Sequence, residues 1–147
     1  MNASTNTAAR ERLEALVGEW TIEAGPPGGP PWPGEGRVTF EWLEEAPLLV
    51  QRSHVDLPEA PDTVAIIGCD GMSDTYHQLY TDDRDVQRIY AMSLRDGIWK
   101  LWRDGEPFSQ RYTGTFSEDG RTIAGRWEKQ ENGEWTTDFD LTYTKVG

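Results

Sequence analysis

An arginine and a tyrosine two positions apart, Arg88 and Tyr90, are the residues of this 147-residue chain whose spacing best suits binding chemistry. Alternate side chains of an extended strand point to the same face, so the guanidinium and the phenol would lie side by side. Together they could donate hydrogen bonds to one carboxylate. The alternative is a structural ion pair of Arg88 with Glu128 or Asp138, because a buried arginine needs a partner in any case.

The other candidates follow from the assumption that large apolar side chains mark the inward face of each strand. Val50 then places Arg52 and His54 inside. In the same way, Met92 places Arg88 and Tyr90 inside, and Phe108 places Gln110 and Tyr112 inside. Because a barrel lined in this way leaves a polar and aromatic cavity, we expect these side chains to orient a ligand. The predicted ligand-binding set is Arg52, His54, Tyr80, Arg88, Tyr90, Trp102, Gln110, Tyr112, Arg126 and Glu128.

The histidines and the single cysteine do not predict a metal site. His54, Cys69 and His77 lack the close spacing that metal ligands usually show. If Tyr76 faces inward, His77 faces outward, which leaves His54 as the imidazole expected inside. His54 could be a haem ligand, a general base or a hydrogen-bonded lining residue. We therefore assign no catalytic residue and no metal ligand.

Composition indicates one folded, acidic domain. A net charge of −12 opposes binding to a phosphate backbone or an anionic membrane surface, so we expect a small-molecule ligand, no nucleic acid and no membrane. The first ten residues lack the hydrophobic run of a secretory signal, and one cysteine cannot form an internal disulfide. These features favour a cytoplasmic protein. Asp138 and Asp140 are expected to face outward.

Short strands must position the candidate residues. Residues 1–7 are expected as a flexible tail and residues 8–147 as a single domain, with one short helix over Ala8–Val17 that stops at Gly18. Turn pairs such as Asp96-Gly97 and Asn132-Gly133 indicate hairpin links. The pattern predicts an all-β fold, a closed up-and-down antiparallel β-barrel of about ten strands. These strands are Trp20–Ala24, Arg37–Leu43, Leu48–Val55, Thr63–Cys69, Thr75–Asp82, Val86–Leu94, Ile98–Arg103, Ser109–Phe116, Thr122–Glu128 and Trp135–Thr144.

A Gly-x-Trp pair, Gly18 and Trp20, opens the first strand after the short helix. This arrangement resembles the calycin superfamily, and within it the small bacterial lipocalin-like domains of uncharacterised function near the nitrobindin and fatty-acid-binding-protein branch. The resemblance implies the barrel fold and a homodimer as a state to test. Arg88-x-Tyr90 is similar to the pair with which fatty-acid-binding proteins hold a ligand's head group. The segments that carry the resemblance further are Leu49–Ser53, Ala65–Asp70, Phe108–Arg111 and Gly125–Glu128.

Three functions are compatible with these observations. The first is the binding of a small hydrophobic or amphipathic molecule, which could be an anion, in the lumen. The second is an enzyme in which His54 is the general base and an arginine or tyrosine stabilises an oxyanion. The third is a nitrobindin-like haem protein with His54 or His77 as axial ligand, although nitrobindins use a late-strand histidine and none follows His77 here. We favour the binding protein over the enzyme and expect no resident cofactor.

The segment Gly25–Gly36 is rich in proline and glycine. A loop of this composition is either a flexible lid or a packed cover centred on Trp32.

Overall fold

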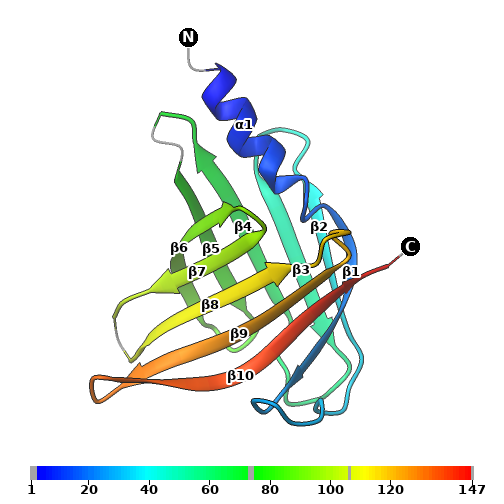
Figure 1. Ribbon diagram of the computed structural model, residues 1–147, viewed down its shortest axis with the longest axis vertical. Coiled ribbons are helices and arrows are strands. Elements are labelled where there is room, and N and C mark those ends of the chain that lie inside the picture. The colour runs from blue at the N-terminus through cyan, green and yellow to red at the C-terminus, as the bar shows by residue number, and fades with distance from the viewer. Residues whose placement is uncertain (1–2, 73–74, 106, 147) are drawn as a thin grey trace.

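The computed structural model describes residues 3–72, 75–105 and 107–146. Within these residues the chain forms one helix followed by ten antiparallel strands in up-and-down order, which close into a barrel (Figure 1). This confirms the predicted fold class. The elements are α1 (Ala3–Leu13), β1 (Gly18–Gly25), β2 (Gly36–Trp42), β3 (Leu49–Val55), β4 (Thr63–Asp70), β5 (Thr75–Asp82), β6 (Gln87–Arg95), β7 (Ile98–Arg103), β8 (Ser109–Phe116), β9 (Thr122–Glu131) and β10 (Glu134–Lys145).

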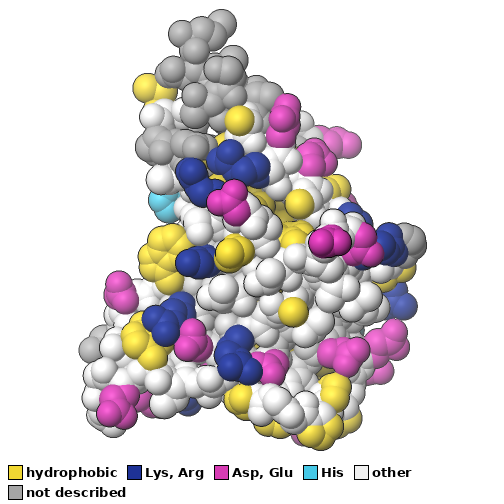
Figure 2. All heavy atoms as spheres, viewed as in Figure 1, with side chains coloured by type: hydrophobic (Ala, Val, Ile, Leu, Met, Phe, Trp, Pro, Cys, Tyr) yellow, Lys and Arg dark blue, Asp and Glu magenta, His cyan; other side chains and the backbone are white. Residues whose placement is uncertain are grey.

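The barrel closes because β1 pairs with the strands on both of its sides. Trp20 faces Val38 of β2 across one ladder and Lys145 of β10 across the other. Closure satisfies the backbone groups that an edge strand would expose. In the face seen in Figure 2, acidic and basic side chains are interspersed rather than gathered in one patch.

The helix begins and ends earlier than predicted. It covers Ala3–Leu13 rather than Ala8–Val17, so residues 3–7 belong to the helix, while the flexibility predicted for residues 1–7 stays a prediction. After Leu13 the chain tightens into single turns, in which the amide of Val17 donates to the carbonyl of Glu14 at 3.1 Å. Gly18 then has a φ of 127°, which favours glycine, and β1 starts there. No helix in the described ranges has the length and apolar character needed to cross a membrane.

The helix covers one end of the barrel (Figure 1). The Tyr76 hydroxyl donates to the carbonyl of Ala9 at 2.7 Å and accepts from Nε of Arg12 at 3.0 Å. The indole of Trp20 donates to the carbonyl of Leu16 at 2.9 Å. These bonds fix the helix to β5 and the turn after the helix to β1, and Leu16 in that turn is fully buried.

An aromatic cluster fills the part of the barrel next to the helix. The rings of Trp20 and Tyr143 pack edge to face with centroids 6.3 Å apart, and Phe40 packs on Trp99 at 6.1 Å. Trp99 in turn contacts Tyr112 at 5.4 Å. All five side chains are buried. This filled end leaves the opposite end of the barrel as the place where a ligand could bind.

Candidate functional site

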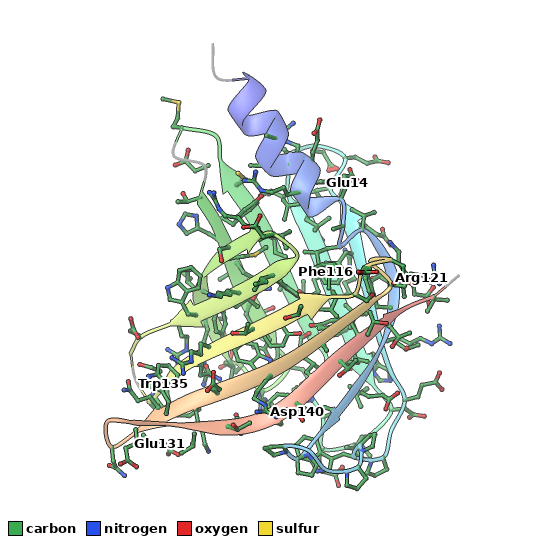
Figure 3. All side chains as sticks on the ribbon, in the orientation of Figure 1. Glu14, Phe116, Arg121, Glu131, Trp135 and Asp140 are labelled. Carbon is green, nitrogen blue, oxygen red and sulfur yellow. The ribbon has the colours of Figure 1, made fainter. Side chains whose placement is uncertain are left out.

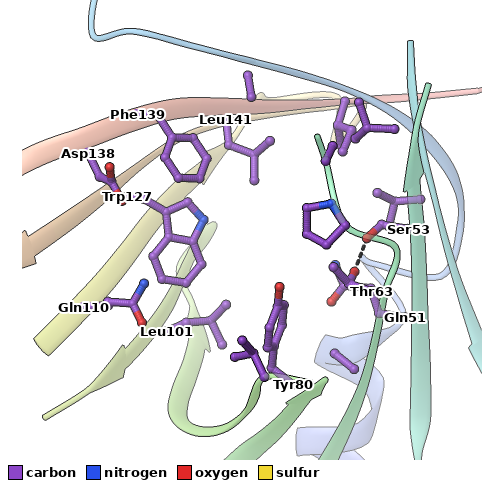
Figure 4. A pocket seen from close by; sticks show the side chains of 18 of the residues that line it. Gln51, Ser53, Thr63, Tyr80, Leu101, Gln110, Trp127, Asp138, Phe139 and Leu141 are labelled. Atoms are coloured by element: carbon purple, nitrogen blue, oxygen red, sulfur yellow. Dashed lines mark hydrogen bonds between the residues drawn. The ribbon is translucent and has the colours of Figure 1, made fainter. Parts of the chain in front are cut away.

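The end of the barrel away from the helix is hollow. A cavity of about 580 Å³ opens there, a size typical of small-molecule sites. Figure 4 shows the apolar side chains of Trp127, Phe139 and Leu141 on one side of it, with Gln51 and Ser53 on the opposite wall. The lining is therefore mixed, with aromatic and aliphatic surface on β9 and β10 and polar groups on β3.

The proline- and glycine-rich segment lies over the mouth of this cavity. The amide of Trp32 donates to the carbonyl of Ala24 at 2.7 Å, and its ring lies 5.9 Å from that of Phe139. The amide of Gly28 donates to a carboxylate oxygen of Asp140 at 3.0 Å. These contacts attach the segment to the barrel, although residues 27–35 are exposed and Trp32 is 48% exposed. Whether the segment is a flexible lid or a packed cover stays a prediction.

Three hydrogen-bond donors converge on one oxygen in the cavity wall. Oε1 of Gln110 accepts from Nη1 of Arg88 at 2.9 Å, from the hydroxyl of Tyr90 at 3.0 Å and from Nε of Arg103 at 3.0 Å. The donors come from β6 and β7 and the acceptor from β8. A neutral carboxamide oxygen thus occupies a position that two guanidinium groups and a phenol make favourable for an anion.

No acid in the described part of the chain pairs with Arg88. Its guanidinium carbon lies 5.7 Å from the ring of Phe108. The predicted alternative, an ion pair with Glu128 or Asp138, is wrong, because Glu128 pairs on the outside of the barrel with Arg111 at 2.8 Å. The positive charge of Arg88 is therefore available to a ligand in the cavity.

Burial favours the neutral, hydrogen-bond-donating form of the Tyr90 phenol. Burial raises its pKa, and the neighbouring guanidinium groups of Arg88 and Arg103 offset only part of that rise. A neutral phenol donates a hydrogen bond to an anion without adding a charge of its own.

A second polar group lies at the rim of the cavity. The hydroxyl of Tyr80 donates to Oδ2 of Asp82 at 2.8 Å, and Nη2 of Arg84 reaches the same oxygen at 2.6 Å. The hydrogen bond from Arg84 holds the pKa of Asp82 well below its usual range. Burial, and then the bond to Asp82, raises the pKa of Tyr80. This group holds its own carboxylate, whereas the acceptor in the cluster around Gln110 is a neutral oxygen.

The structure divides the ten predicted site residues into three sets. Four of them line the cavity, one faces inward below it, and five face outward. Their roles in binding stay predictions. The residues that line the cavity are Tyr80, Arg88, Tyr90 and Gln110, and the residue below it is Tyr112. The outward-facing residues are Arg52, His54, Trp102, Arg126 and Glu128.

The inward placement of Arg52 and His54 is wrong because β3 has the opposite phase. Gln51 faces the inward Phe40 across the β2–β3 ladder, so its neighbours on either side point outward. Val50, which suggested the phase, is on the outer side yet only 6% exposed. Burial on both faces of β3 made its apolar residues a poor marker of the inside.

Trp102, Arg126 and Glu128 are also on the outer wall, not in the lumen. Trp102 alternates with the inward Leu101 and is 39% exposed. Nε of Arg126 pairs with Asp140 at 2.8 Å on the outside, where Figure 3 shows Asp140 on β10. The ion pairs of Arg126 and Glu128 link neighbouring strands on this outer wall.

Tyr112 belongs to the floor of the cavity rather than to its lining. Its ring lies 5.3 Å from Trp127 and 5.4 Å from Trp99, and its hydroxyl approaches the carbonyl of Leu141 at 3.5 Å. Gly125 faces this ring, and a Cβ there would lie 2.0 Å from the phenol oxygen. The glycine therefore makes room for the tyrosine that closes the floor.

Two important groups were missed or misplaced from the sequence. Arg103 alternates with the inward Trp99 and Leu101, and this signal could have found it. Asp138 lines the cavity instead of facing outward, because a bulge between Thr137 and Phe139 shifts its direction. No pattern in the sequence marks that bulge.

Haem does not fit on the histidines of this chain. His54 is exposed outside the barrel, where its Nδ1 lies 2.6 Å from Asp62. His77 is also exposed, between the inward Tyr76 and Gln78. Neither can reach a group in the cavity, and the same placement removes His54 as a lumenal base. The described residues contain no cluster of three side chains suited to a metal ion.

The fold and the hollow end define a closed, ten-stranded antiparallel β-barrel with a cavity at the end opposite its helix. Among solved structures it is similar to the crystal structure of Rv2717c from M. tuberculosis, with a TM-score of 0.68 and 13% identity over 95% of this chain and 98% of that chain. No protein-family model and no curated protein matches the chain. The likeness shows the barrel fold that the calycin resemblance implies, while membership of that superfamily and of any branch within it stays a prediction.

Proposed function

We propose that the barrel binds a small amphipathic anion in its lumen. The observation that carries the proposal is the convergence of Arg88, Tyr90 and Arg103 on the neutral Oε1 of Gln110 in the cavity wall. A carboxylate at this position would turn the two bonds from the guanidinium groups into ion-paired hydrogen bonds, and the neutral bond from Tyr90 into a charge-assisted one, about twice as strong. Gln110 would turn aside and leave the donors to the ligand.

The rest of the cavity suits the apolar body of such a ligand. Tyr90 and Trp127 pack edge to face at 5.7 Å beside the donors, and Phe139 and Leu141 extend this surface along β10. Burying apolar ligand surface here contributes roughly 25 cal/mol per Å² removed from water. Asp138, also in the lining, offers an acceptor to a hydroxyl or amino group on the same ligand.

The test compares two probes of equal chain length, decanoic acid and 1-decanol, by isothermal titration calorimetry. The wild-type protein should bind decanoate more tightly than the neutral alcohol. Arg88→Ala should weaken decanoate binding by about 10- to 100-fold, the loss of one hydrogen bond to a charged group, and leave decanol binding unchanged. Arg52→Ala is the matched control, because Arg52 is exposed on the outer wall.

Two results would contradict the proposal. One is equal affinity of the wild-type protein for the acid and the alcohol. The other is an Arg88→Ala protein that loses its cooperative thermal unfolding without a specific loss of decanoate binding, which would make Arg88 a structural residue.

A further inference from the structure

The barrel wall has a break between β6 and β7. The ladder between these strands runs from Ala91 and Trp102 to Arg95 and Ile98. The preceding four residues of β6, Gln87–Tyr90, pair with β5 but have no partner on β7. Among the described residues, no backbone hydrogen bond between β6 and β7 closes the wall at this point.

Side chains close the break instead. Arg88 and Tyr90 reach across from β6, and Arg103 reaches from the end of β7. All three meet at the carboxamide of Gln110 on β8. Side chains can change rotamer where a ladder cannot, so this stretch of wall can admit a ligand group without breaking the sheet.

A groove runs along the outer side of the same break. Ile89 and Leu79 are 68% and 42% exposed in it, and Asp85 lies in its lining. Val86 and Arg88 line both the groove and the cavity, so a single layer of side chains separates the two. The apolar lining consists of Leu79, Val86, Ile89 and Pro107, and the cations are Arg88 and Arg103.

We propose that this groove is the outer half of the ligand site. The anionic group lies in the break on Arg88, Tyr90 and Arg103, the main apolar body lies in the cavity, and a second apolar group beside the charge lies outside against Ile89. The inference rests on the proposed function. It specifies the ligand class as an anion with apolar groups on both sides of its charge, such as an N-acyl amino acid with an aliphatic side chain.

Continuity and charge favour a ligand group as the occupant of the groove. The two guanidinium groups that would hold the anion are part of the groove lining. A substituent bonded next to the anionic group would therefore lie in the groove. The exposed Ile89 and Leu79 would gain burial from an aliphatic side chain at that position. Association of two copies through the same residues is the competing occupant, and the experiment separates the two.

The experiment uses N-decanoyl-glycine and N-decanoyl-leucine, which share chain length and charge and differ only in the leucyl side chain. Calorimetry on the wild-type protein should show the leucine compound binding about tenfold more tightly. Ile89→Asp should bring the two affinities together and leave that for the glycine compound unchanged. Val64→Asp is the matched control, because Val64 is an outer-wall residue of β4, 41% exposed and outside the groove, and this variant should keep the tenfold preference.

Each other outcome overturns a defined step. Equal wild-type affinities for the two compounds would refute the groove and leave the proposed function standing. Failure of both compounds and of decanoate to bind would refute the proposed function itself. A leucine preference that survives Ile89→Asp would place the side chain elsewhere. A wild-type dimer that Ile89→Asp converts to monomer in sedimentation velocity would assign the surface to self-association. Ile89→Ser serves as the second variant if Ile89→Asp lowers the melting temperature.

Discussion

Gln110→Glu should stabilise the protein and abolish anion binding at the same time. The substitution keeps the size of the side chain and turns the acceptor of three hydrogen bonds into a carboxylate. The protein would then carry its own anion between Arg88 and Arg103. A ligand carboxylate would have to displace a covalently held one, so decanoate affinity should fall at least about 100-fold while 1-decanol affinity stays the same.

The size of the stabilisation follows from the bonds involved. The bonds from Arg88 and Arg103 already have a charged donor and would gain an ion pair, while the neutral bond from Tyr90 would rise from about 1 kcal/mol to about 1.5–3 kcal/mol; burial of the carboxylate takes back part of this gain. A net gain of about 1–2 kcal/mol corresponds to a rise in melting temperature of about 2–8 °C for a domain of this size. The guanidinium groups should lower the pKa of the new carboxyl. The gain in unfolding free energy is therefore complete above the pKa of this carboxyl in the unfolded chain, about 4.3. It is lost as the pH falls through the lower pKa of the same carboxyl in the folded protein.

Thermal denaturation at pH 7 and pH 3, with calorimetry of both probes, measures all of these effects. Gln110→Leu is the control, because it leaves the three donors without their acceptor and should lower stability by about 1–3 kcal/mol. A Gln110→Glu protein that melts below the wild type at pH 7, or that binds decanoate as the wild type does, would refute the reasoning that the donor cluster is an anion site.

Two further predictions test the floor and the outer wall of the barrel. Gly125→Ala should cost about 3 kcal/mol in urea unfolding, since its Cβ would lie 2.0 Å from the phenol oxygen of the buried Tyr112. Tyr112→Leu in the same protein should recover part of that loss, and an unchanged unfolding free energy would contradict the packing argument. Nuclear magnetic resonance titration should find the pKa of His54 above 6.5, because the hydrogen bond and charge of Asp62 favour the imidazolium, and Asp62→Asn should return it to about 6.5. The contribution of the His54–Asp62 pair to stability is complete below about pH 6.5 and is lost as the pH rises through the higher pKa of His54 in the folded protein. A wild-type His54 pKa at or below 6.5 would show that the contact with Asp62 does not form.

The barrel was predictable because its evidence is local and repeated. Turn pairs such as Asp96-Gly97 and Asn132-Gly133 place positive φ angles where hairpins need them, and each Asp, Asn and Gly of these pairs has one. Ten strands joined in this way have few arrangements other than a meander, and closure follows from the cost of exposed edges. The start of the helix was not predictable to the same degree, because residues 4–7 are Ser, Thr, Asn and Thr, which are weak helix formers and give no sign of an earlier start.

Strand phase decided which site residues were placed correctly. On β6 the inward face holds Tyr90, Met92 and Leu94, all buried, and the outer face holds Ile89, which is exposed. The large apolar residues Tyr90, Met92 and Leu94 therefore marked the inside, with Ile89 as the exception. On β3 they did not, because Val50 is buried on the outer side.

Pairing partners carry the information that a single strand lacks. Phe40 on β2 is inward, and its partner across the ladder on β3 is Gln51, so the phase of β3 follows from that of β2 once the register is known. The register is set by the length of the β2–β3 connection and by the turn within it, and no single residue type encodes these. A polar residue such as Gln51 can thus line a cavity while the apolar residue before it faces outward.

The site itself arises from a place where the regular pattern stops. Arg88 and Arg103 meet Gln110 where the β6–β7 ladder has ended, and Asp138 reaches the cavity through the bulge in β10. In the regular part of a barrel, neighbouring side chains pack against each other and satisfy their polar groups locally. At a break the strands diverge, and two guanidinium groups can approach one oxygen from different strands. An anion gains at this position because it would meet two guanidinium groups and a phenol that now share one neutral acceptor.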